Sequence, residues 1–354
     1  MEECIFLSVF AVLCFLLGYG VNWFLLRFSG NRLAKEAPKN STRWEERKKP
    51  TIGGISFFSV FIFAILSYFI VYGNVIEKVE LSVLLIGTSL GFTLGLLDDL
   101  KNAPVWAKFG SQFLIGFLFL FFGFKIHLFE IYWLDALITV IWVVGIMNSI
   151  NMLDNMDGVT AGTTLFIFIG FILLACQGAE EGFNTLNMKI LLGVSMSIIA
   201  FLRYNLHPSK MYMGDVGSQF IGVLLAAFAI KYVWNGQDFF AVELPTKQIA
   251  AIASLFIVPL SDTTTVFYKR IRRGDSPFKG GRDHTTHHLV YAGMSQKYVA
   301  PLYMMLTLIG VLVTYFIFKI PFEWSLWWFF GILLYNITVF SVLFYIANLH
   351  KDKD

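Results

Sequence analysis

The sequence predicts an all-α, polytopic membrane protein with about 11 transmembrane helices. Apolar residues make up 57% of its 354 residues and charged residues only 14%, whereas a soluble domain carries about a quarter charged residues. The apolar residues gather in long runs, and Lys and Arg are concentrated in a few of the polar connections between them. Helices are the expected spanning element, because a helix satisfies its own backbone hydrogen bonds in lipid.

The apolar runs are close to the length of a spanning helix, which needs about 20 residues at 1.5 Å per residue. The first run follows an acidic N-terminus and shows no small-residue cleavage site, so we predict a spanning helix rather than a removed signal peptide. We find no internal repeat and predict a single integral-membrane domain over residues 1–354. The expected spans are 4–26, 52–72, 81–97, 105–122, 133–147, 161–176, 188–202, 216–233, 248–268, 298–319 and 326–347.

The distribution of Lys and Arg predicts the orientation, because cytoplasmic loops of membrane proteins are enriched in both. The connections 27–50 and 269–297 are the most basic. Placing 27–50 in the cytoplasm puts the N-terminus outside and the C-terminus inside, with 21 of the 27 Lys and Arg residues on the cytoplasmic side. The same threading puts the unusual polar clusters of the chain on that side.

The first of these clusters is the stretch Asn148–Gly162, NSINMLDNMDGVTAG, which separates two apolar runs. It contains the acids Asp154 and Asp157 and the amides Asn151 and Asn155. Removing water from such groups at a membrane is costly, which favours a functional role. The alternative is a solvated turn that is rich in helix-capping residues.

The second cluster is the acid pair Asp98 and Asp99 at the end of the third span, in GLLDDLKNAP. Two adjacent carboxylates repel each other, and the helix dipole disfavours both at a C-terminus. A structural role would call for Lys or Arg at that place, and Lys101 and Lys108 compensate only in part. We therefore predict a catalytic or metal-binding role for the pair.

The third cluster, MYMGDVGSQFIG, places Asp215 at the start of the eighth span. An acid at a helix N-terminus is an ordinary cap, and this alternative stays open. Gly214 and Gly217, however, allow a backbone or a phosphate to approach the acid closely.

The fourth cluster lies in the basic, histidine-containing loop 269–297, which includes RRGDSPFKGGRDHTTHHLVYAG. The positive-inside rule explains its Lys and Arg residues, but not three histidines within five positions. A His/Asp metal site is one interpretation, although no separate His/Cys group accompanies it. A phosphate-binding surface fits better, with Arg282, His284, His287 and His288 facing acids that hold a divalent ion.

Asp262 differs from these groups because it falls inside the ninth expected span, in FIVPLSDTTTVFYKRIRR. An intramembrane acid predicts a functional site by default. The alternative is a pairing with a neighbouring base or with the hydroxyls of residues 263–265.

Acids that face bases at the inner surface of a membrane suit phosphoryl transfer. Mg²⁺ is typically held by one or two carboxylates together with substrate phosphates, and phosphoryl transfer requires such an ion and cationic groups but little covalent help. An enzyme that joins a nucleotide-activated group to a lipid phosphate needs these parts at the cytoplasmic surface.

The chain resembles the polyprenyl-phosphate N-acetylhexosamine-1-phosphate transferase family, which includes WecA, TagO and MraY. The matching motifs are GLLDDLKN, NSINMLDNMDGVTAG, YMGDVGS and PLSDTTTVFYKRIRRGDSPFKGGRDHTTHHL, in the family's order between residues 95 and 289. The resemblance implies transfer of a sugar 1-phosphate from a UDP-N-acetylhexosamine to undecaprenyl phosphate in the bacterial inner membrane, with release of UMP. It also implies Mg²⁺ as the cofactor, with Mn²⁺ as a substitute, and no nucleic-acid partner. Small residues in the spans would allow a homodimer.

The resemblance also implies roles for the motif residues. Asp215 would bind Mg²⁺, and Asp98 would lie by the lipid phosphate as a base or an orienting group, supported by Asp99. The remaining residues fall into two groups. Asn151, Asp154 and Asp157 would line the nucleotide pocket, with Asp154 also a catalytic candidate, and Lys108, Arg282, Asp262, His284, His287 and His288 would bind or act on the phosphates and the sugar.

The histidine loop reads more like the WecA/TagO branch than MraY, which favours UDP-GlcNAc over UDP-MurNAc-peptide. Two features depart from the pattern expected in this branch. Thr285 and Thr286 stand between the first histidine and the final pair where one residue is expected, and Asn155 stands between Asp154 and Asp157. The alternative donors are therefore UDP-MurNAc-peptide or a rarer UDP-N-acetyl sugar. A proton-coupled transporter, from a different functional class, would place its acids nearer mid-bilayer and often show inverted repeats.

Overall fold

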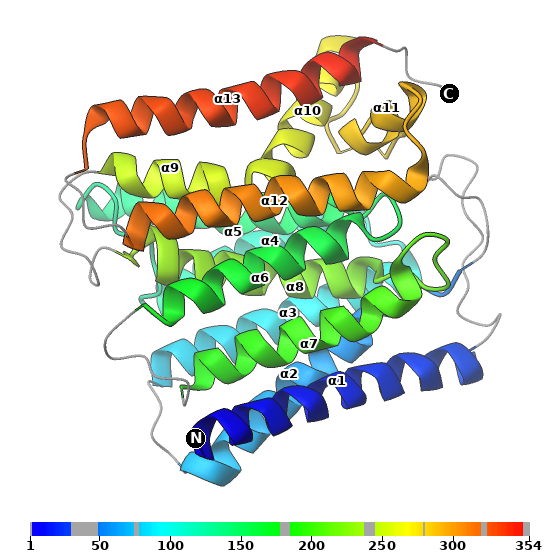
Figure 1. The fold of residues 1–354 in the computed structure, drawn as a ribbon, viewed down its shortest axis with the longest axis vertical. Helices are drawn as coiled ribbons and strands as arrows, with labels where there is room; N and C mark the ends of the chain where they lie inside the picture. The colour runs from blue at the N-terminus through cyan, green and yellow to red at the C-terminus, as the bar shows by residue number, and fades with distance from the viewer. Residues whose placement is uncertain are drawn as a thin grey trace.

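The computed structural model describes residues 2–29, 49–73, 78–177, 185–236, 245–278, 280–319 and 324–349. Most of the basic connection 27–50 and Lys279 of the histidine loop lie outside these ranges. The described residues form a bundle of helices (Figure 1), which confirms the all-α prediction. The α-helices are α1 Glu2–Ser29, α2 Gly54–Tyr72, α3 Lys78–Lys101, α4 Val105–Phe121, α5 Tyr132–Leu153, α6 Val159–Ala175, α7 Leu186–Asn205, α8 Gly214–Ala229, α9 Pro245–Leu255, α10 Ile257–Arg273, α11 Thr285–Tyr291, α12 Gln296–Lys319 and α13 Leu326–Leu349.

The helices confirm a multi-pass membrane protein. Eight of them in the described ranges are long and apolar enough to cross a membrane, and α9 with α10 passes the same test as a bent pair. The two other predicted spans, 105–122 and 161–176, correspond to the shorter apolar helices α4 and α6. In Figure 1, α1 and α13 lie at opposite edges of the bundle. Both carry many exposed apolar side chains, as expected of helices that face lipid.

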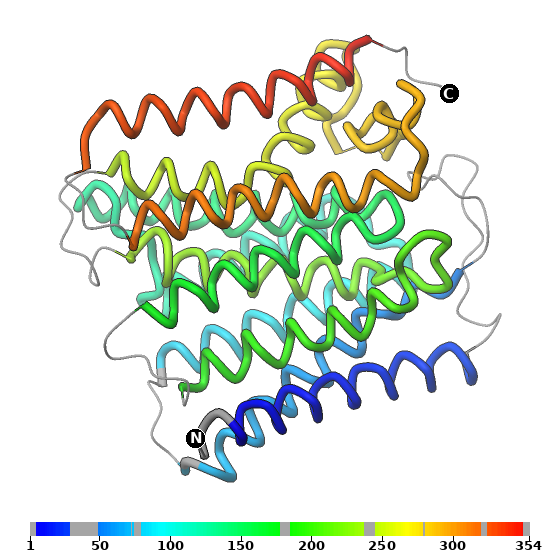
Figure 2. The backbone as a smooth tube through the Cα atoms, viewed as in Figure 1, coloured from blue at the N-terminus to red at the C-terminus, as the bar shows by residue number. Residues whose placement is uncertain are grey.

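The predicted span 248–268 is wrong as a single straight helix. It consists of α9 and α10, whose axes differ by 80°, and Figure 2 shows the chain turning between them. Phe256 leaves helical geometry at the junction, and Pro259 follows in the first turn of α10. A proline fits there because the first N–H groups of a helix have no intrahelical partner. Asp262 therefore lies on a helix that has turned across the bundle, not along a straight span.

Three other boundaries differ from the prediction, and each affects the candidate site. Helix α3 continues to Lys101, so both acids of the pair lie on its last turns. Helix α5 continues to Leu153, so Asn148 and Asn151 are helical. The loop 269–297 contains the end of α10, the short helix α11 and the start of α12.

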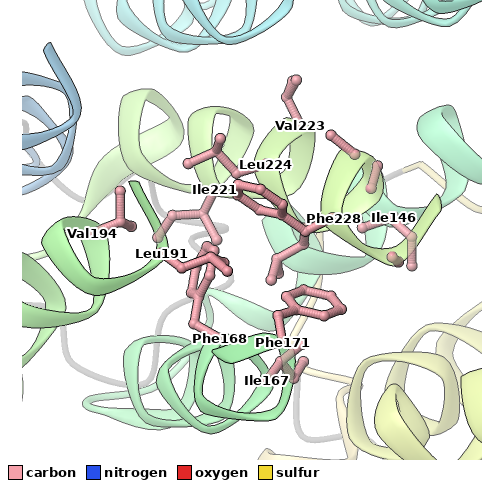
Figure 3. Close-up of a cluster of buried hydrophobic side chains, with 14 of the residues drawn as sticks. Ile146, Ile167, Phe168, Phe171, Leu191, Val194, Ile221, Val223, Leu224 and Phe228 are labelled. Atoms are coloured by element: carbon pink, nitrogen blue, oxygen red, sulfur yellow. The ribbon is translucent and has the colours of Figure 1, made fainter. Parts of the chain in front are cut away.

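Helix α8 is the centre of the bundle, and nearly all of its residues are buried. It continues into a π-helical turn, Ile230–Trp234. Figure 3 shows Phe168 and Phe171 of α6 pointing toward side chains of α8, and the Phe171 and Phe228 rings lie 6.1 Å apart. Because α8 is enclosed on all sides, its first residue positions are fixed relative to the neighbouring helices.

Glycines let the backbones come close at the start of α8. A Cβ atom on Gly54 of α2 would lie 2.2 Å from the backbone nitrogen of Gly217. The segments that precede the two helices also pair, because the N–H groups of Gly53 and Gly54 donate to the carbonyls of Tyr212 and Met213, both at 3.0 Å. The entry to α8 is therefore anchored before the helix begins.

Candidate active site

Close packing of α3 against α8 brings two predicted acids together. A Cβ atom on Gly95 of α3 would lie 2.2 Å from the carbonyl oxygen of Asp215. Asp98 follows three positions later, on the same face of α3, and so reaches the start of α8. The Lys108 ammonium contacts the Asp98 carboxylate and lies 3.8 Å from that of Asp215. The result is an acid–lysine–acid cluster, Asp98, Lys108 and Asp215.

Asn151 orients the Asp215 side of this cluster. Its side-chain amide donates to Oδ1 of Asp215 at 2.7 Å and to Oγ of Ser218 at 2.9 Å. Asp215 Oδ2 is the oxygen that faces Lys108. The Asp215 side chain is 31% exposed and that of Asp98 only 5%, so Asp215 is the more accessible of the two carboxylates.

Three side-chain amides, about one helical turn from Lys108, Asn151 and Asp215, form a second layer beside the cluster. Gln112 of α4 donates to Oε1 of Gln219 on α8 at 3.2 Å. Asn148 of α5 donates to Oε1 of Gln112 at 2.7 Å. These amides join α4, α5 and α8 beside the acids, and such a connected polar network makes the arrangement rigid.

The two adjacent acids of the pair have different surroundings. Asp99 accepts the backbone N–H of Val216 at 2.9 Å through Oδ2, and so caps the start of α8 from a neighbouring helix. Gly214 is required beside it: its φ is +73°, and a Cβ atom there would lie 2.6 Å from Asp99 Oδ2. Asp98 faces Lys108, whereas Asp99 positions the helix that carries Asp215.

The residues of this cluster fit a magnesium ion. Mg²⁺ prefers hard oxygen donors and is usually held by one or two carboxylates, with water and substrate phosphates completing its coordination. Asp98 and Asp215 supply two carboxylates that approach one cationic group from two helices. Among the described residues, no group of three or more His, Cys, Asp and Glu side chains is arranged to hold a metal.

Asp157 is placed differently from our prediction that it lines the nucleotide pocket. Its carboxylate is buried and accepts from the Ser209 hydroxyl at 2.6 Å and from the Ser209 N–H at 3.0 Å. The His207 ring lies 3.2 Å away, and the Lys49 ammonium lies 3.9 Å away. Asp157 therefore ties the connection after α5 to the connection before α8.

Asp154 ends α5 as its C-cap residue and is half-buried, so it stays at the surface of the same connection. Next to it, Asn155 is buried and accepts a hydrogen bond from Thr286 of α11 at 2.6 Å. The connection that follows α5 thus contacts both the entry to α8 and the histidine segment.

His284 and His288 contact different residues of α10. His284 lies 2.8 Å from Asp262 of α10 through Nδ1, and Asp262 also accepts from the Thr285 N–H and hydroxyl. His288 lies 2.6 Å from the Lys269 ammonium and is fully buried. We predicted that Asp262 and His288 bind substrate. In the structure both are buried and contact residues that hold α11 in place, and a role in substrate binding stays a prediction.

His287 is fully buried between these two, with its ring 5.6 Å from that of His284 in an edge-on contact. Burial and, to a smaller extent, the nearby His284 lower the pKa of His287 to about 3, so the ring is neutral. A neutral imidazole can accept as well as donate a proton.

Arg282 and Asp283 lead into α11. Burial alone would raise the pKa of Asp283, but the Arg270 guanidinium, which forms two hydrogen bonds at 2.8 and 2.9 Å, and Arg273 hold that pKa below its usual value. This ion pair fixes the loop before α11. Arg282 itself is half-buried, so part of its side chain can reach a ligand.

Sequence reasoning missed several residues that organise the site. Buried amides, hydroxyls and ion pairs have no distinctive spacing in a sequence, and each becomes visible only where a distant segment meets it. A polar residue in an otherwise apolar span, such as Gln112 or Gln219, is the one pattern that could have indicated them. The missed residues are Lys49, Gln112, His207, Ser209, Ser218, Gln219, Arg270 and Asp283.

Fold and site together define a multi-pass membrane protein that gathers acids, a lysine, amides and histidines where its helices begin and end. The model of glycosyl transferase family 4 matches residues 81–233, which contain the acid–lysine–acid cluster. A phospho-N-acetylmuramoyl-pentapeptide-transferase of Dictyoglomus turgidum is 31% identical over 249 residues, covering 65% of this chain and 75% of the relative. The chain therefore belongs to glycosyl transferase family 4.

The chain also matches most of the length of two other curated relatives. A probable undecaprenyl-phosphate N-acetylglucosaminyl 1-phosphate transferase of Bacillus subtilis (strain 168) is 27% identical over 273 residues, covering 75% of this chain and 72% of the relative. A phospho-N-acetylmuramoyl-pentapeptide-transferase of Limosilactobacillus reuteri is 24% identical over 326 residues, covering 87% of this chain and 94% of the relative. The names of these relatives differ in the sugar that they transfer.

Proposed function

We propose that this protein transfers N-acetylglucosamine 1-phosphate from UDP-GlcNAc to undecaprenyl phosphate, releasing UMP, as the first lipid-linked step of a cell-envelope glycan. The observation that carries the proposal is the cluster of Asp98, Lys108 and Asp215, oriented by Asn151. The cluster lies within residues 81–233, which match the model of family 4, and the name of the Bacillus subtilis relative also supports the reaction class.

Each residue of the cluster has a task in this reaction. Asp215, the more accessible carboxylate, would hold Mg²⁺, and Asp98 lies by the phosphate of the lipid. The ion screens the charge of the two anionic substrates when it is bound. Lys108 neutralises the acids and offers a cation to the phosphates.

A strong general base is not required at Asp98. The second pKa of a phosphate monoester is about 6, so much of the lipid phosphate is a dianion near neutral pH and is already nucleophilic. The main barrier is repulsion between two anions, and the protein lowers it by positioning and by positive charge. Asp98 therefore orients Lys108 and the acceptor phosphate.

The donor binds across the connection after α5 and the segment around α11. Asn151 and Asp154 face the nucleotide, while the half-buried Arg282 contacts the diphosphate or the sugar phosphate and the buried His284 is held by Asp262 next to it. His287 is enclosed and neutral, which suits a ring that orients its neighbours. We place this surface on the cytoplasmic side of the inner membrane, because the threading with most Lys and Arg inside puts it there.

Phospho-MurNAc-pentapeptide transfer is the second candidate, because the Dictyoglomus turgidum relative carries that name. The reaction and the acid cluster are the same, and the difference lies in the sugar and its peptide. The sequence of the histidine loop favours the smaller donor.

UMP release by purified protein tests the proposal. The protein is supplied with undecaprenyl phosphate and Mg²⁺, with UDP-GlcNAc and UDP-MurNAc-pentapeptide offered in parallel. We expect release with UDP-GlcNAc alone, and release with the peptide donor alone would assign the second function. No release with either donor, in protein that keeps its fold, would contradict both.

A further inference from the structure

A buried hydrogen bond links the connection after α5 to α11. The Thr286 hydroxyl donates to Oδ1 of Asn155 at 2.6 Å, across 131 positions of the chain, and both side chains are buried. The amide of Asn155 donates at 3.0 Å to the carbonyl of Met152. This second bond fixes the orientation of the amide, so that its oxygen faces α11.

Thr285 and His288 of α11 bond in different directions, whereas His287 also contacts the backbone of Asn155. Thr285 bonds to Asp262 of α10 and to the Tyr303 hydroxyl of α12, both at 2.6 Å. His288 reaches Lys269, which also donates at 2.9 Å to the carbonyl of Ala347 on α13. These contacts anchor α11 to the C-terminal helices, whereas the contact between Thr286 and Asn155 joins it to the stretch that carries Asn151 and Asp154.

Apolar packing surrounds this hydrogen bond. Leu153, Met156, Leu289, Val299 and Tyr303 form one buried cluster that spans the end of α5, α11 and α12. The two segments therefore stay packed without the hydrogen bond. What the bond adds is their register, because a directional contact between two buried polar groups is satisfied in one arrangement only.

We propose that Asn155 and Thr286 form a positioning pair for the donor substrate, which holds the half-buried Asn151 and Asp154 and the segment that runs from Arg282 into α11 as one preformed surface. The inference rests on the proposed function, because it assumes a donor that spans both segments. Asp98 and Lys108 lie on α3 and α4, outside this surface, so the pair acts on the donor and not on the lipid.

The test uses the full-length protein and three variants. Thr286→Val keeps the shape of the side chain and removes the hydroxyl, whereas Thr286→Ser keeps the hydroxyl. Thr307→Val is the matched control, because the Thr307 hydroxyl is equally buried but bonds within its own helix, to the Tyr303 carbonyl at 2.8 Å. The KM values for UDP-GlcNAc and undecaprenyl phosphate are measured separately, and binding of UDP is measured by calorimetry.

We expect Thr286→Val to raise the KM for UDP-GlcNAc and the Kd for UDP about 3- to 10-fold, the size expected for one lost hydrogen bond. The KM for undecaprenyl phosphate should not change, Thr286→Ser should restore the donor values, and Thr307→Val should resemble the wild type. Equal effects on both substrates, or an effect no larger than that of the control, would overturn the inference.

Two further measurements keep the inference separate from the proposed function and from folding. If wild-type protein releases no UMP from any UDP-N-acetylhexosamine, the proposed function fails, and UDP binding alone still decides whether Thr286→Val differs from Thr307→Val. If Thr286→Val folds poorly, the double variant with Asn155→Ala removes both polar partners and relieves the unpaired amide. UDP binding by that double variant should stay weak, and wild-type affinity would contradict the pair.

Discussion

Asn151 donates a hydrogen bond to Oδ1 of Asp215 at 2.7 Å, and this contact leaves Oδ2 of the same carboxylate facing Lys108 at 3.8 Å. The amide comes from the last turn of α5 and the acid from the first turn of α8. One side chain thus determines which oxygen of Asp215 is presented to the Lys108 ammonium.

Asp215→Asn should abolish activity without unfolding the protein. The substitution keeps the size of the side chain but removes the charge that binds Mg²⁺, and we expect UMP release to fall by about 100-fold or more. Thermal unfolding of the variant should match that of the wild type. Asp275→Asn is the control, because Asp275 is also partly exposed but pairs with Arg273 outside the cluster. Near-normal turnover of Asp215→Asn would contradict the metal assignment.

Substitution of Asp99 should lower mainly the stability of the protein, whereas substitution of Asp98 should lower mainly its activity. Asp99→Ala removes the acceptor of the Val216 N–H at the start of α8, and we expect the free energy of unfolding to fall by about 1–2 kcal/mol, as for a lost helix cap. Asp98→Asn leaves that cap in place, so removing the charge of Asp98 should lower mainly kcat. Thermal unfolding and UMP release of both variants check this. A larger loss of stability in Asp98→Asn than in Asp99→Ala would contradict the division of roles.

Apolar side chains beside the cluster should contact the lipid substrate. Leu100 of α3 and Trp106 of α4 are 59% and 77% exposed and lie close to Asp98 and Lys108 in the chain. Trp106→Ala should raise the KM for undecaprenyl phosphate about 3- to 10-fold through lost apolar contact, with no change for UDP-GlcNAc. Phe121→Ala, at the far end of α4, is the control. Equal changes for the two substrates would argue against a separate lipid path.

The buried carboxylate of Asp157 should matter for folding more than for chemistry. Asp157→Ala leaves Ser209 without its acceptor and Lys49 without its ion-pair partner, and breaking a buried ion pair by removing one partner costs about 3–5 kcal/mol. Ser209→Ala should cost less, about 1 kcal/mol, because the carboxylate keeps its other contacts. Thermal unfolding in detergent measures both. A stable Asp157→Ala protein with lost UDP binding would restore Asp157 to the nucleotide site.

Stability should fall in mild acid because of His287. Its pKa is lowered to about 3 in the folded protein, chiefly by burial, whereas the unfolded chain takes up a proton near pH 6.5. Between these values the unfolded state binds more protons, so its free energy falls relative to the folded state as pH decreases, by about 1.4 kcal/mol per pH unit for one group. His287→Gln should lose less stability than the wild type between about pH 7.5 and about pH 5. An identical loss in both proteins would contradict this.

Much of the site could be predicted from the sequence, because carboxylates, amides and histidines next to apolar runs conflict with a membrane environment and stand out for that reason. Asp98, Asn151, Asp215 and His284 were predicted in this way, and the structure brings Asp98, Asn151 and Asp215 together. The residue pattern alone did not distinguish Asp98 from Asp99, and only the family resemblance implied different roles for them. The physical difference is that the Val216 N–H of a neighbouring helix donates to Asp99.

The sequence also could not show which polar side chains are buried among protein groups. Asp157, Asp262 and His288 look like ligand-binding residues in a linear pattern, yet each has protein partners that are distant in the chain, namely Ser209, His284 and Lys269. Pairing of buried polar groups depends on which segments meet, and a single sequence carries no record of that.

The sequence by itself determined that the chain is helical and crosses the membrane several times, because the length and composition of an apolar run specify a spanning helix without reference to its neighbours. It also determined which residue types are available for phosphate chemistry. Only the tertiary structure decided the 80° turn between α9 and α10 and the bond between Asn155 and Thr286. Those features arise from close packing and directional hydrogen bonds between distant segments, and such interactions exist only once the helices have assembled.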